Sequence, residues 1–213
     1  MNNAVNKALW FTNFGNNSIG RITTAGVITI YSATGIASPG GITAGPDGAL
    51  WFTNSNANSI DRITASGTVT SYTGTGIDEP KGITTGPDGA LWFTNVTSNS
   101  IGRITTAGVV TSYTGTGTGI DEPEGITAGP DGALWFTNFG GSSIGRITTS
   151  GTVTNYTGTG IDEPEGITAG PDGALWFTNS GSDTIGRITT SGTVTSYAST
   201  GILSSPESIT AGP

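Results

Sequence analysis

Apolar residues along the chain occur in short clusters that return at a nearly fixed interval. The string Ala-Leu-Trp-Phe-Thr-Asn occurs in five copies, whose tryptophans lie 41 or 43 residues apart: Trp10, Trp51, Trp92, Trp135 and Trp176. One tyrosine and one arginine per copy follow with the same spacing. The sequence therefore contains five copies of a unit of about 41 residues, and repetition at this interval is typical of repeat architectures.

Each unit predicts four short β-strands separated by turns. In the second unit, residues 41–45 predict the first strand, residues 49–54 the second and residues 68–72 the fourth, while residues 100–105 of the next unit represent the third. Gly-Pro-Asp-Gly joins the first two strands, and it suits a tight turn because proline presets φ and glycine tolerates a positive φ. No segment has the 3.6-residue period of an amphipathic helix, so we expect no helix.

The second strand of each unit fixes the predicted architecture. Its Leu-Trp-Phe core is continuously apolar, which favours burial on both faces of the sheet. Radial stacking of sheets buries both faces and leaves only short edges. We therefore predict that residues 1–213 form a single all-β domain, a five-bladed β-propeller of four-stranded antiparallel blades.

The two ends of the sequence suggest how the ring closes. Residues 208–212 match the first strand of a unit, and residues 8–13 match the second. We expect the C-terminal strand to join the N-terminal blade and close the ring within a monomer. The alternative is a ring of two chains or a swapped dimer.

Composition and charge exclude several functions. The chain has no cysteine, hence no disulfide or thiolate metal site, and no histidine, the commonest general base and transition-metal ligand. Seven basic and fifteen acidic residues give a net charge of −8, which disfavours binding to nucleic acid or to an anionic membrane surface. No apolar run approaches the roughly 20 residues of a membrane span. The first residues do not resemble a signal peptide, so we expect a soluble protein of undetermined compartment.

The connections between units carry most of the acidic residues and form the candidate ligand-binding rim of the central channel. Its members are Asp78, Glu79, Lys81, Asp121, Glu122, Glu124, Asp162, Glu163 and Glu165. Clustered carboxylates suit Mg²⁺ or Ca²⁺, and Glu79, Glu122 and Glu163 are the candidate metal ligands. The alternative is a solvated acidic rim that requires no cofactor.

The arginines and tryptophans that recur in every repeat have structural interpretations. The arginines are expected to pair with the aspartate of each Pro-Asp-Gly turn, and Arg21 to be the least well paired because Asn6 replaces that aspartate in the first unit. The tryptophans are expected to pack between blades. The loops after the second strands diverge most, and they expose Phe14 and Phe139, so a small molecule or glycan would bind there.

The repeated string Ile-Thr-Ala-Gly-Pro-Asp-Gly-Ala-Leu-Trp-Phe-Thr-Asn, followed by Ile-Gly-Arg-Ile-Thr-Thr-Ser-Gly, resembles the blades of virginiamycin B lyases over essentially the whole chain. The resemblance implies a magnesium-dependent propeller, seven-bladed in that family, which opens a cyclic depsipeptide antibiotic by elimination across its ester bond. It also implies a Glu-Pro-His-Gly motif with a catalytic histidine. Glu79, Glu122 and Glu163 match its glutamate, but the histidine positions hold Lys81, Glu124 and Glu165.

The near-identity of the repeats indicates a recently amplified, reconstructed or engineered propeller. We expect a non-catalytic scaffold that binds a ligand or cation weakly at the acidic channel mouth. The first alternative is a carbon–oxygen lyase that works with carboxylates and Lys81 alone. The second is a lectin-like module that uses the divergent loops.

Overall fold

A computed structural model describes residues 8–114, 117–198 and 204–212, and it consists almost entirely of antiparallel strands. The first sheet has three strands, β1 (Ala8–Asn13), β2 (Ser18–Thr23) and β3 (Ile28–Tyr31). The other four sheets have four strands each: β4 (Pro39–Ala44), β5 (Leu50–Asn54), β6 (Ser59–Ile63) and β7 (Val69–Thr73); β8 (Pro80–Thr85), β9 (Leu91–Asn95), β10 (Ser100–Ile104) and β11 (Val110–Tyr113); β12 (Pro123–Ala128), β13 (Leu134–Asn138), β14 (Ser143–Ile147) and β15 (Val153–Tyr156); β16 (Pro164–Ala169), β17 (Leu175–Asn179), β18 (Thr184–Ile188) and β19 (Val194–Ala198).

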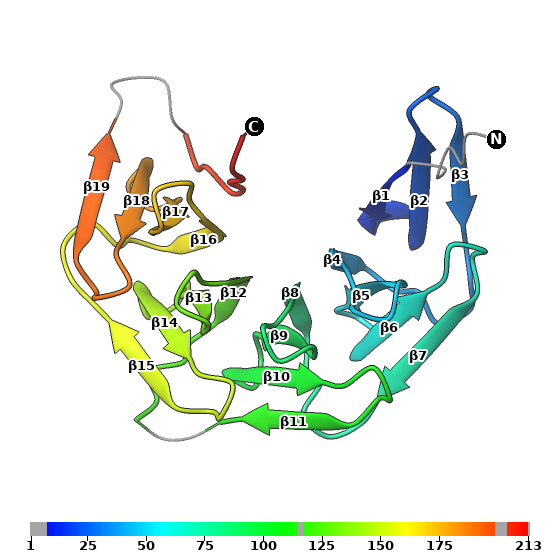
Figure 1. The fold of residues 1–213 in the computed structure, drawn as a ribbon, viewed down its shortest axis with the longest axis horizontal. Coiled ribbons are helices and arrows are strands. Elements are labelled where there is room, and N and C mark those ends of the chain that lie inside the picture. Colours follow the sequence, from blue (N-terminus) through cyan, green and yellow to red (C-terminus); the bar gives the residue numbers. More distant parts are fainter. Residues whose placement is uncertain (1–7, 115–116, 199–203, 213) are drawn as a thin grey trace.

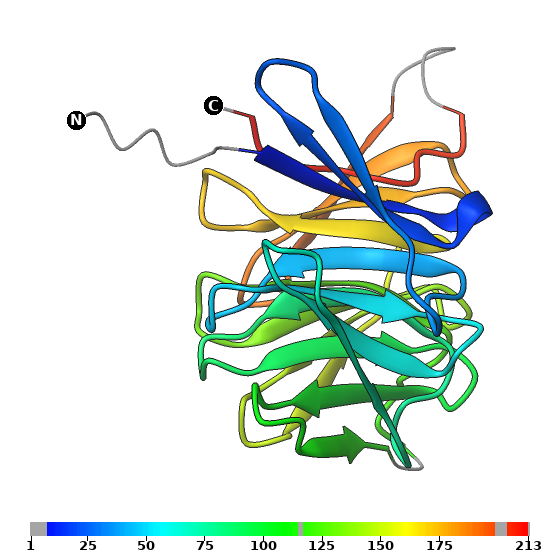
Figure 2. The same ribbon diagram turned by 90° about the vertical axis from the view of Figure 1, so that its right-hand side faces the viewer.

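The five sheets are arranged radially as the blades of a propeller (Figure 1), which confirms the predicted fold. Strands β4, β8, β12 and β16 lie nearest the centre, and β7, β11, β15 and β19 lie at the periphery. From the side, the strands run across the thickness of the molecule, and the connecting turns gather on its two faces (Figure 2). One face therefore carries both the connections between blades and the loops after the second strands.

The inner strands approach one another so closely that they need glycine. A Cβ atom on Gly82 of β8 would lie 2.5 Å from the carbonyl oxygen of Glu124 in β12, and Gly125 has the same relation to Glu165. A register shift between Pro123 and Ile126 accompanies this approach. The repeated Pro-x-Gly sequence thus packs the inner strands side by side around the centre.

Each interface between blades has an apolar core. Trp135 and Ile144 of the fourth blade pack against Leu175, Phe177 and their neighbours in the fifth. Trp51, Trp92 and Trp135 are completely buried, which confirms their predicted packing role. Every described tryptophan also stacks on the tyrosine of its own blade, with ring centroids 5.2–5.4 Å apart.

The predicted closure by the C-terminal strand is not shown. The first sheet contains only β1, β2 and β3, and residues 204–212 form no strand. The blades form an arc that is open between the C-terminal segment and β1 (Figure 1).

A second difference from the sequence prediction is a short 3₁₀-helix, η1 (Phe14–Asn16). It arises because Asn17 adopts a left-handed conformation and its N–H donates to the carbonyl of Phe14 at 3.4 Å. Within the part of the chain that the structure describes, no helix is long and apolar enough to cross a membrane.

Candidate functional site

The centre of the propeller contains a cavity of about 370 Å³ lined by the inner strands. The residue after the proline of each connection contributes to its wall: Lys81 in β8, Glu124 in β12, Glu165 in β16 and Glu207 in the C-terminal segment. The second blade has Gly40 at this position. Equivalent positions of a nearly symmetric repeat therefore place one ammonium group and three carboxylates around one cavity.

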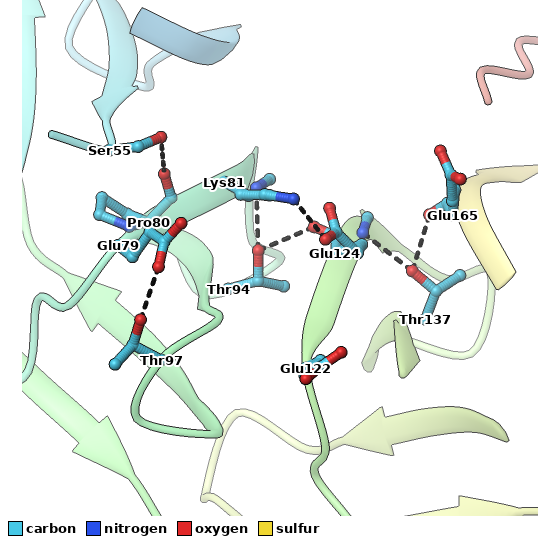
Figure 3. A network of polar contacts seen from close by, with 12 residues as sticks. Ser55, Glu79, Pro80, Lys81, Thr94, Thr97, Glu122, Glu124, Thr137 and Glu165 are labelled. Atoms are coloured by element: carbon cyan, nitrogen blue, oxygen red, sulfur yellow. Dashed lines mark hydrogen bonds and ion pairs between the residues drawn. The ribbon is translucent and has the colours of Figure 1, made fainter. Parts of the chain in front are cut away.

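Buried threonines hold these residues in place (Figure 3). Thr94 Oγ1 accepts a hydrogen bond from the N–H of Gly82 and donates one to the carbonyl oxygen of Glu124, both at 2.8 Å. Thr137 likewise accepts from Gly125 at 2.9 Å and donates to Glu165 at 2.7 Å. Each threonine thus joins two neighbouring inner strands and fixes the backbone from which the cavity side chains project.

An ion pair links the only cation of the cavity wall to one carboxylate. Lys81 Nζ lies 2.5 Å from Glu124 Oε1 (Figure 3). Burial raises the pKa of the Glu124 carboxyl; the hydrogen bond and charge of Lys81 oppose this effect, and the nearby carboxylates of Glu165 and Glu122 add to it. The fold therefore shifts Glu124 toward the protonated form, and Lys81 limits this shift.

The other two carboxylates of the cavity have no such partner. Among residues 8–114, 117–198 and 204–212, Glu165 and Glu207 form no side-chain ion pair, and the pair of Lys81 with Glu124 is the only one in the cavity wall. Because one lysine faces three glutamates, the cavity wall favours a positively charged group over an anion. Glu207 was missed in the sequence analysis, although its position after Pro206 matches that of Glu165 after Pro164.

The nine residues of the predicted rim separate into two sets. Lys81, Glu124 and Glu165 lie together in the cavity wall. The other six lie in the turns between blades and outside the cavity lining: Asp78, Glu79, Asp121, Glu122, Asp162 and Glu163.

The second set stabilises connections between blades. Glu79 and Glu122 have positive φ angles of 49° and 45°, and their N–H groups donate to the side chains of Asn58 and Asn99 at 2.8 Å. The Glu79 carboxylate accepts a hydrogen bond from Thr97 Oγ1 at 2.6 Å. The sequence could not separate the two sets because the left-handed turn before each proline directs its side chain away from the following residue.

The magnesium implied by the family resemblance does not fit the described residues well. No group of three or more carboxylates among them is placed to hold a metal ion. The Lys81 ammonium already places a positive charge beside Glu124 Oε1, which disfavours a second cation at this oxygen. The assignment of Glu79, Glu122 and Glu163 as metal ligands stays a prediction.

The divergent loops reach the same cavity at two points. Phe14 and Ser55 belong to loops after second strands, and both line the cavity. The Phe14 side chain is 65 % exposed. Phe139, its counterpart in the fourth blade, is half-buried and is not part of this lining.

The repeated arginines have a structural role, as predicted. Arg103 Nε lies 2.7 Å from Asp88 Oδ2. The other oxygen of the Asp88 carboxylate, Oδ1, accepts a hydrogen bond from Trp92 Nε1 at 3.0 Å. Arg62, Arg146 and Arg187 form the same ion pair with the turn aspartates of their own blades. Partial burial disfavours ionisation of Asp88, but the hydrogen bonds from Trp92 and Arg103 outweigh it and lower the pKa. Arg21 forms no ion pair within the described part of the chain, and Asn6 lies outside it.

Comparisons with known proteins identify close relatives of this arrangement. A sequence profile of the virginiamycin B lyase family matches residues 1–159 and 78–213. The chain is 41 % identical to a catalytically inactive histidine-to-alanine variant of virginiamycin B lyase from Staphylococcus aureus, solved with quinupristin. The TM-score is 0.91, and the match covers 97 % of this chain and 71 % of that chain.

Two further comparisons give the range of the similarity. A selenomethionine-substituted form of the Staphylococcus aureus lyase is 42 % identical, with a TM-score of 0.90 over 98 % of this chain and 72 % of that one. A chain of a nidogen/laminin complex is 19 % identical, with a TM-score of 0.74 over 92 % of this chain and 77 % of that one, so it shares the fold alone. No curated protein sequence matches the chain.

Proposed function

Because this chain belongs to the virginiamycin B lyase family, we propose that it is a propeller scaffold that has kept the family's channel mouth and lost its elimination chemistry. In this proposal the central cavity binds small molecules weakly, and it favours those that carry a positive charge. The alternative is a lyase that opens an ester-closed cyclic peptide with carboxylates and a lysine in place of histidine.

The observation that carries the proposal is the ion pair between Lys81 and Glu124. The family resemblance implies a histidine at the positions of Lys81, Glu124 and Glu165, and the chain contains no histidine at all. The Staphylococcus aureus lyase with one histidine replaced by alanine is described as catalytically inactive. A general base must have enough affinity for the proton that it removes. The hydrogen bond and positive charge of Lys81 stabilise the ionised form of Glu124, which makes this carboxylate a weaker base.

The preference for a cationic ligand follows from the charges around the cavity. Lys81 neutralises the charge of Glu124, and the negative charges of Glu165 and Glu207 remain in the cavity wall. The cavity of about 370 Å³ is large enough for a small ligand, and the exposed ring of Phe14 offers an apolar contact at its edge. Both glutamates are partly in water, so the electrostatic attraction is screened and the expected affinity is low.

Incubation with quinupristin and Mg²⁺ tests the loss of catalysis. Elimination adds no water, so a ring-opened product has the mass of its substrate, and liquid chromatography with fragmentation is needed to detect it. We expect the substrate to be unchanged, while the active Staphylococcus aureus lyase opens it under the same conditions. Turnover by this chain that the Glu124→Gln variant lacks would establish the lyase alternative.

Titration calorimetry with a small diamine tests the binding half of the proposal. We expect weak binding that weakens further in the Glu165→Gln variant and at high salt. Asp78→Asn is the matched control, because it removes one negative charge from the same face but outside the cavity. Equal effects of the two substitutions would show that only net charge attracts the diamine.

A further inference from the structure

Four of the five blades hold one carboxylate between the same two side-chain donors. In the third blade Asp88 Oδ1 accepts a hydrogen bond from Trp92 Nε1 at 3.0 Å, and Asp88 Oδ2 lies 2.7 Å from Arg103 Nε. The second, fourth and fifth blades repeat this arrangement. The two donors fit a planar carboxylate because each of its oxygens has a partner of its own.

The first blade has the two donors without the carboxylate. Asn6, which carries no charge, stands at the position of the turn aspartate. Trp10 and Arg21 lie opposite each other in the register of β1 and β2, as the matching tryptophan and arginine do in every other blade. Among the residues that the structure describes, neither the indole N–H of Trp10 nor the guanidinium of Arg21 has a hydrogen-bond or ion-pair partner.

Packing holds the indole of the first blade as it does in the other blades. The Trp10 ring stacks on Tyr31 with centroids 5.2 Å apart, within the 5.2–5.4 Å range of all five pairs. Both rings also pack against the apolar cluster that contains Phe52 and Ile63 of the second blade. The two donors are therefore placed by strand pairing and ring packing, and they need no carboxylate to bring them together.

The charge distribution along the chain favours an anion at this place. Residues 1–46 contain two basic residues, Lys7 and Arg21, and no aspartate or glutamate, although the whole chain has a net charge of −8. Lys7 also stands where glycine follows the turn aspartate in the other units. An anionic ligand therefore meets less repulsion at the first blade than near the acidic blades.

The position of the missing carboxylate is open to solvent. The aspartate side chains that fill it in the other blades are 19–37 % exposed. Trp10 and Arg21 are half-buried, and neither lines the central cavity. Strand β1 begins on the face opposite the loops that follow the second strands (Figure 2), so this position is separate from the glutamates of the cavity.

We propose that Trp10 and Arg21 form a binding site for the carboxylate group of an external ligand, which takes the place of the turn aspartate of the other blades. One carboxylate oxygen accepts a hydrogen bond from Trp10 Nε1, and the other accepts one from Arg21 Nε. The carboxylate comes from a small organic acid or from an acidic side chain of a peptide. The site is independent of the cation binding proposed for the central cavity.

The fifth blade shows that these two donors favour the ionised form of a carboxyl group. Hydrogen bonds from Trp176 and Arg187 lower the pKa of Asp172 to about 2, although this carboxylate is the most exposed of the four. An external carboxylate makes the same two contacts, but it loses translational freedom because no chain tethers it. We therefore expect half-saturation by acetate in the millimolar range.

Nuclear magnetic resonance of the five indole N–H groups tests the proposal at the site itself. The Trp10→Phe variant assigns the Trp10 signal, and the other four signals are internal references because their indoles already donate to aspartate. We expect sodium acetate to shift the Trp10 signal in a saturable way, and sodium chloride of equal ionic strength to leave it in place. No shift, a shift that chloride reproduces, or an equal shift of the Trp176 signal overturns the proposal.

Three variants test whether the shift depends on the two donors and on the vacant position. Asn6→Asp restores the aspartate of the other units, fills the site and should abolish the response to acetate. Arg21→Gln removes a charged donor and should lower the affinity for acetate about tenfold. Asp131→Ala is the matched positive control, because it empties the same position in the fourth blade and should make the Trp135 signal respond. A Trp10 response that persists unchanged in Asn6→Asp or in Arg21→Gln would place the acetate elsewhere and refute the site.

A blocked tripeptide distinguishes the two sources of the carboxylate. Acetyl-Ala-Asp-Ala-amide has one carboxylate, on a side chain, and acetyl-Ala-Asn-Ala-amide is its neutral control. Saturation by the aspartate peptide at a lower concentration than by acetate supports the site and assigns it to acidic peptides. The reverse order supports the site and assigns it to small organic acids. An equal response to the asparagine peptide would overturn recognition of a carboxylate.

Discussion

Replacement of Asp61 by glycine should stabilise the protein. Asp61 lies in β6, where the other four blades have Gly20, Gly102, Gly145 and Gly186. Its side chain is completely buried. Oδ2 accepts a hydrogen bond from Ser71 Oγ at 2.9 Å, but Oδ1 has no partner within the described part of the chain. The second blade thus carries a buried, half-satisfied carboxyl that its neighbours avoid.

The magnitude follows from three contributions. An unsatisfied buried polar atom costs about 1–3 kcal/mol, more if it is charged. Glycine in a strand costs roughly 0.5–1 kcal/mol in backbone entropy. The loss of the bond to Ser71 costs little, because Ser71 is exposed and regains water. In the other blades a phenylalanine ring covers this glycine, as Phe93 covers Gly102, so the variant leaves no cavity. We expect a net gain of about 1–2 kcal/mol at pH 7.

The gain should depend on pH with a defined sign. Burial raises the pKa of Asp61 above its ordinary value of 3.8, so the folded protein binds this proton more tightly than the unfolded chain does. The stability of the parent protein relative to the variant therefore rises as the pH falls through the folded pKa. We expect the benefit of Asp61→Gly to be full at pH 7 and to shrink below the folded pKa.

Urea denaturation of the two proteins between pH 4 and pH 8 measures both the gain and its pH dependence. Asp61→Asn removes the charge but keeps the volume, and it should give only part of the gain. Gly102→Asp creates the same defect in the third blade and should be destabilising. A variant Asp61→Gly that is less stable than the parent at pH 7, or a pH-independent gain, would refute the reasoning.

Four further predictions concern the charged residues and the effect of added cations. Asp131→Asn removes the partner of Arg146 and should lower the unfolding free energy, measured by thermal melts, by about 1 kcal/mol. Asp172→Asn should have a smaller effect in the same melts, because the carboxyl of Asp172 is more exposed. Hydrogen bonds from Trp176 and Arg187 lower the pKa of Asp172 to about 2, so its contribution should be lost as the pH falls from about 4 to about 2, as followed by circular dichroism. Lys81→Met leaves Glu124 buried beside other carboxylates, and the resulting loss of stability should be smaller at pH 5 than at pH 7, because protonated Glu124 needs no counter-charge. Addition of Mg²⁺ or Ca²⁺ should leave the melting temperature unchanged, and a concentration-dependent rise would instead establish a cation site.

Local features of the structure were predictable from the sequence because each repeat specifies its own turns and faces. The Pro-Asp-Gly turns, the four strands of a unit and the pairing of arginine with the turn aspartate all depend on residues within one blade. The apolar Leu-Trp-Phe cluster also predicted burial on both faces of the second strand, since a strand that is apolar on both faces needs a sheet on each side. Five copies of such a unit specify a propeller.

Features that depend on the relation between blades required the tertiary structure. Each blade interface combines side chains of two successive blades, and no single repeat encodes how the blades meet, so the open arc was not foreseen. The same holds for the rim, where a left-handed turn separates Glu79 from Lys81 and leaves only the residue after each proline in the cavity. The residues of one repeat are enough to define a blade, whereas the way in which blades meet, and which charges share the central cavity, depends on contacts between repeats.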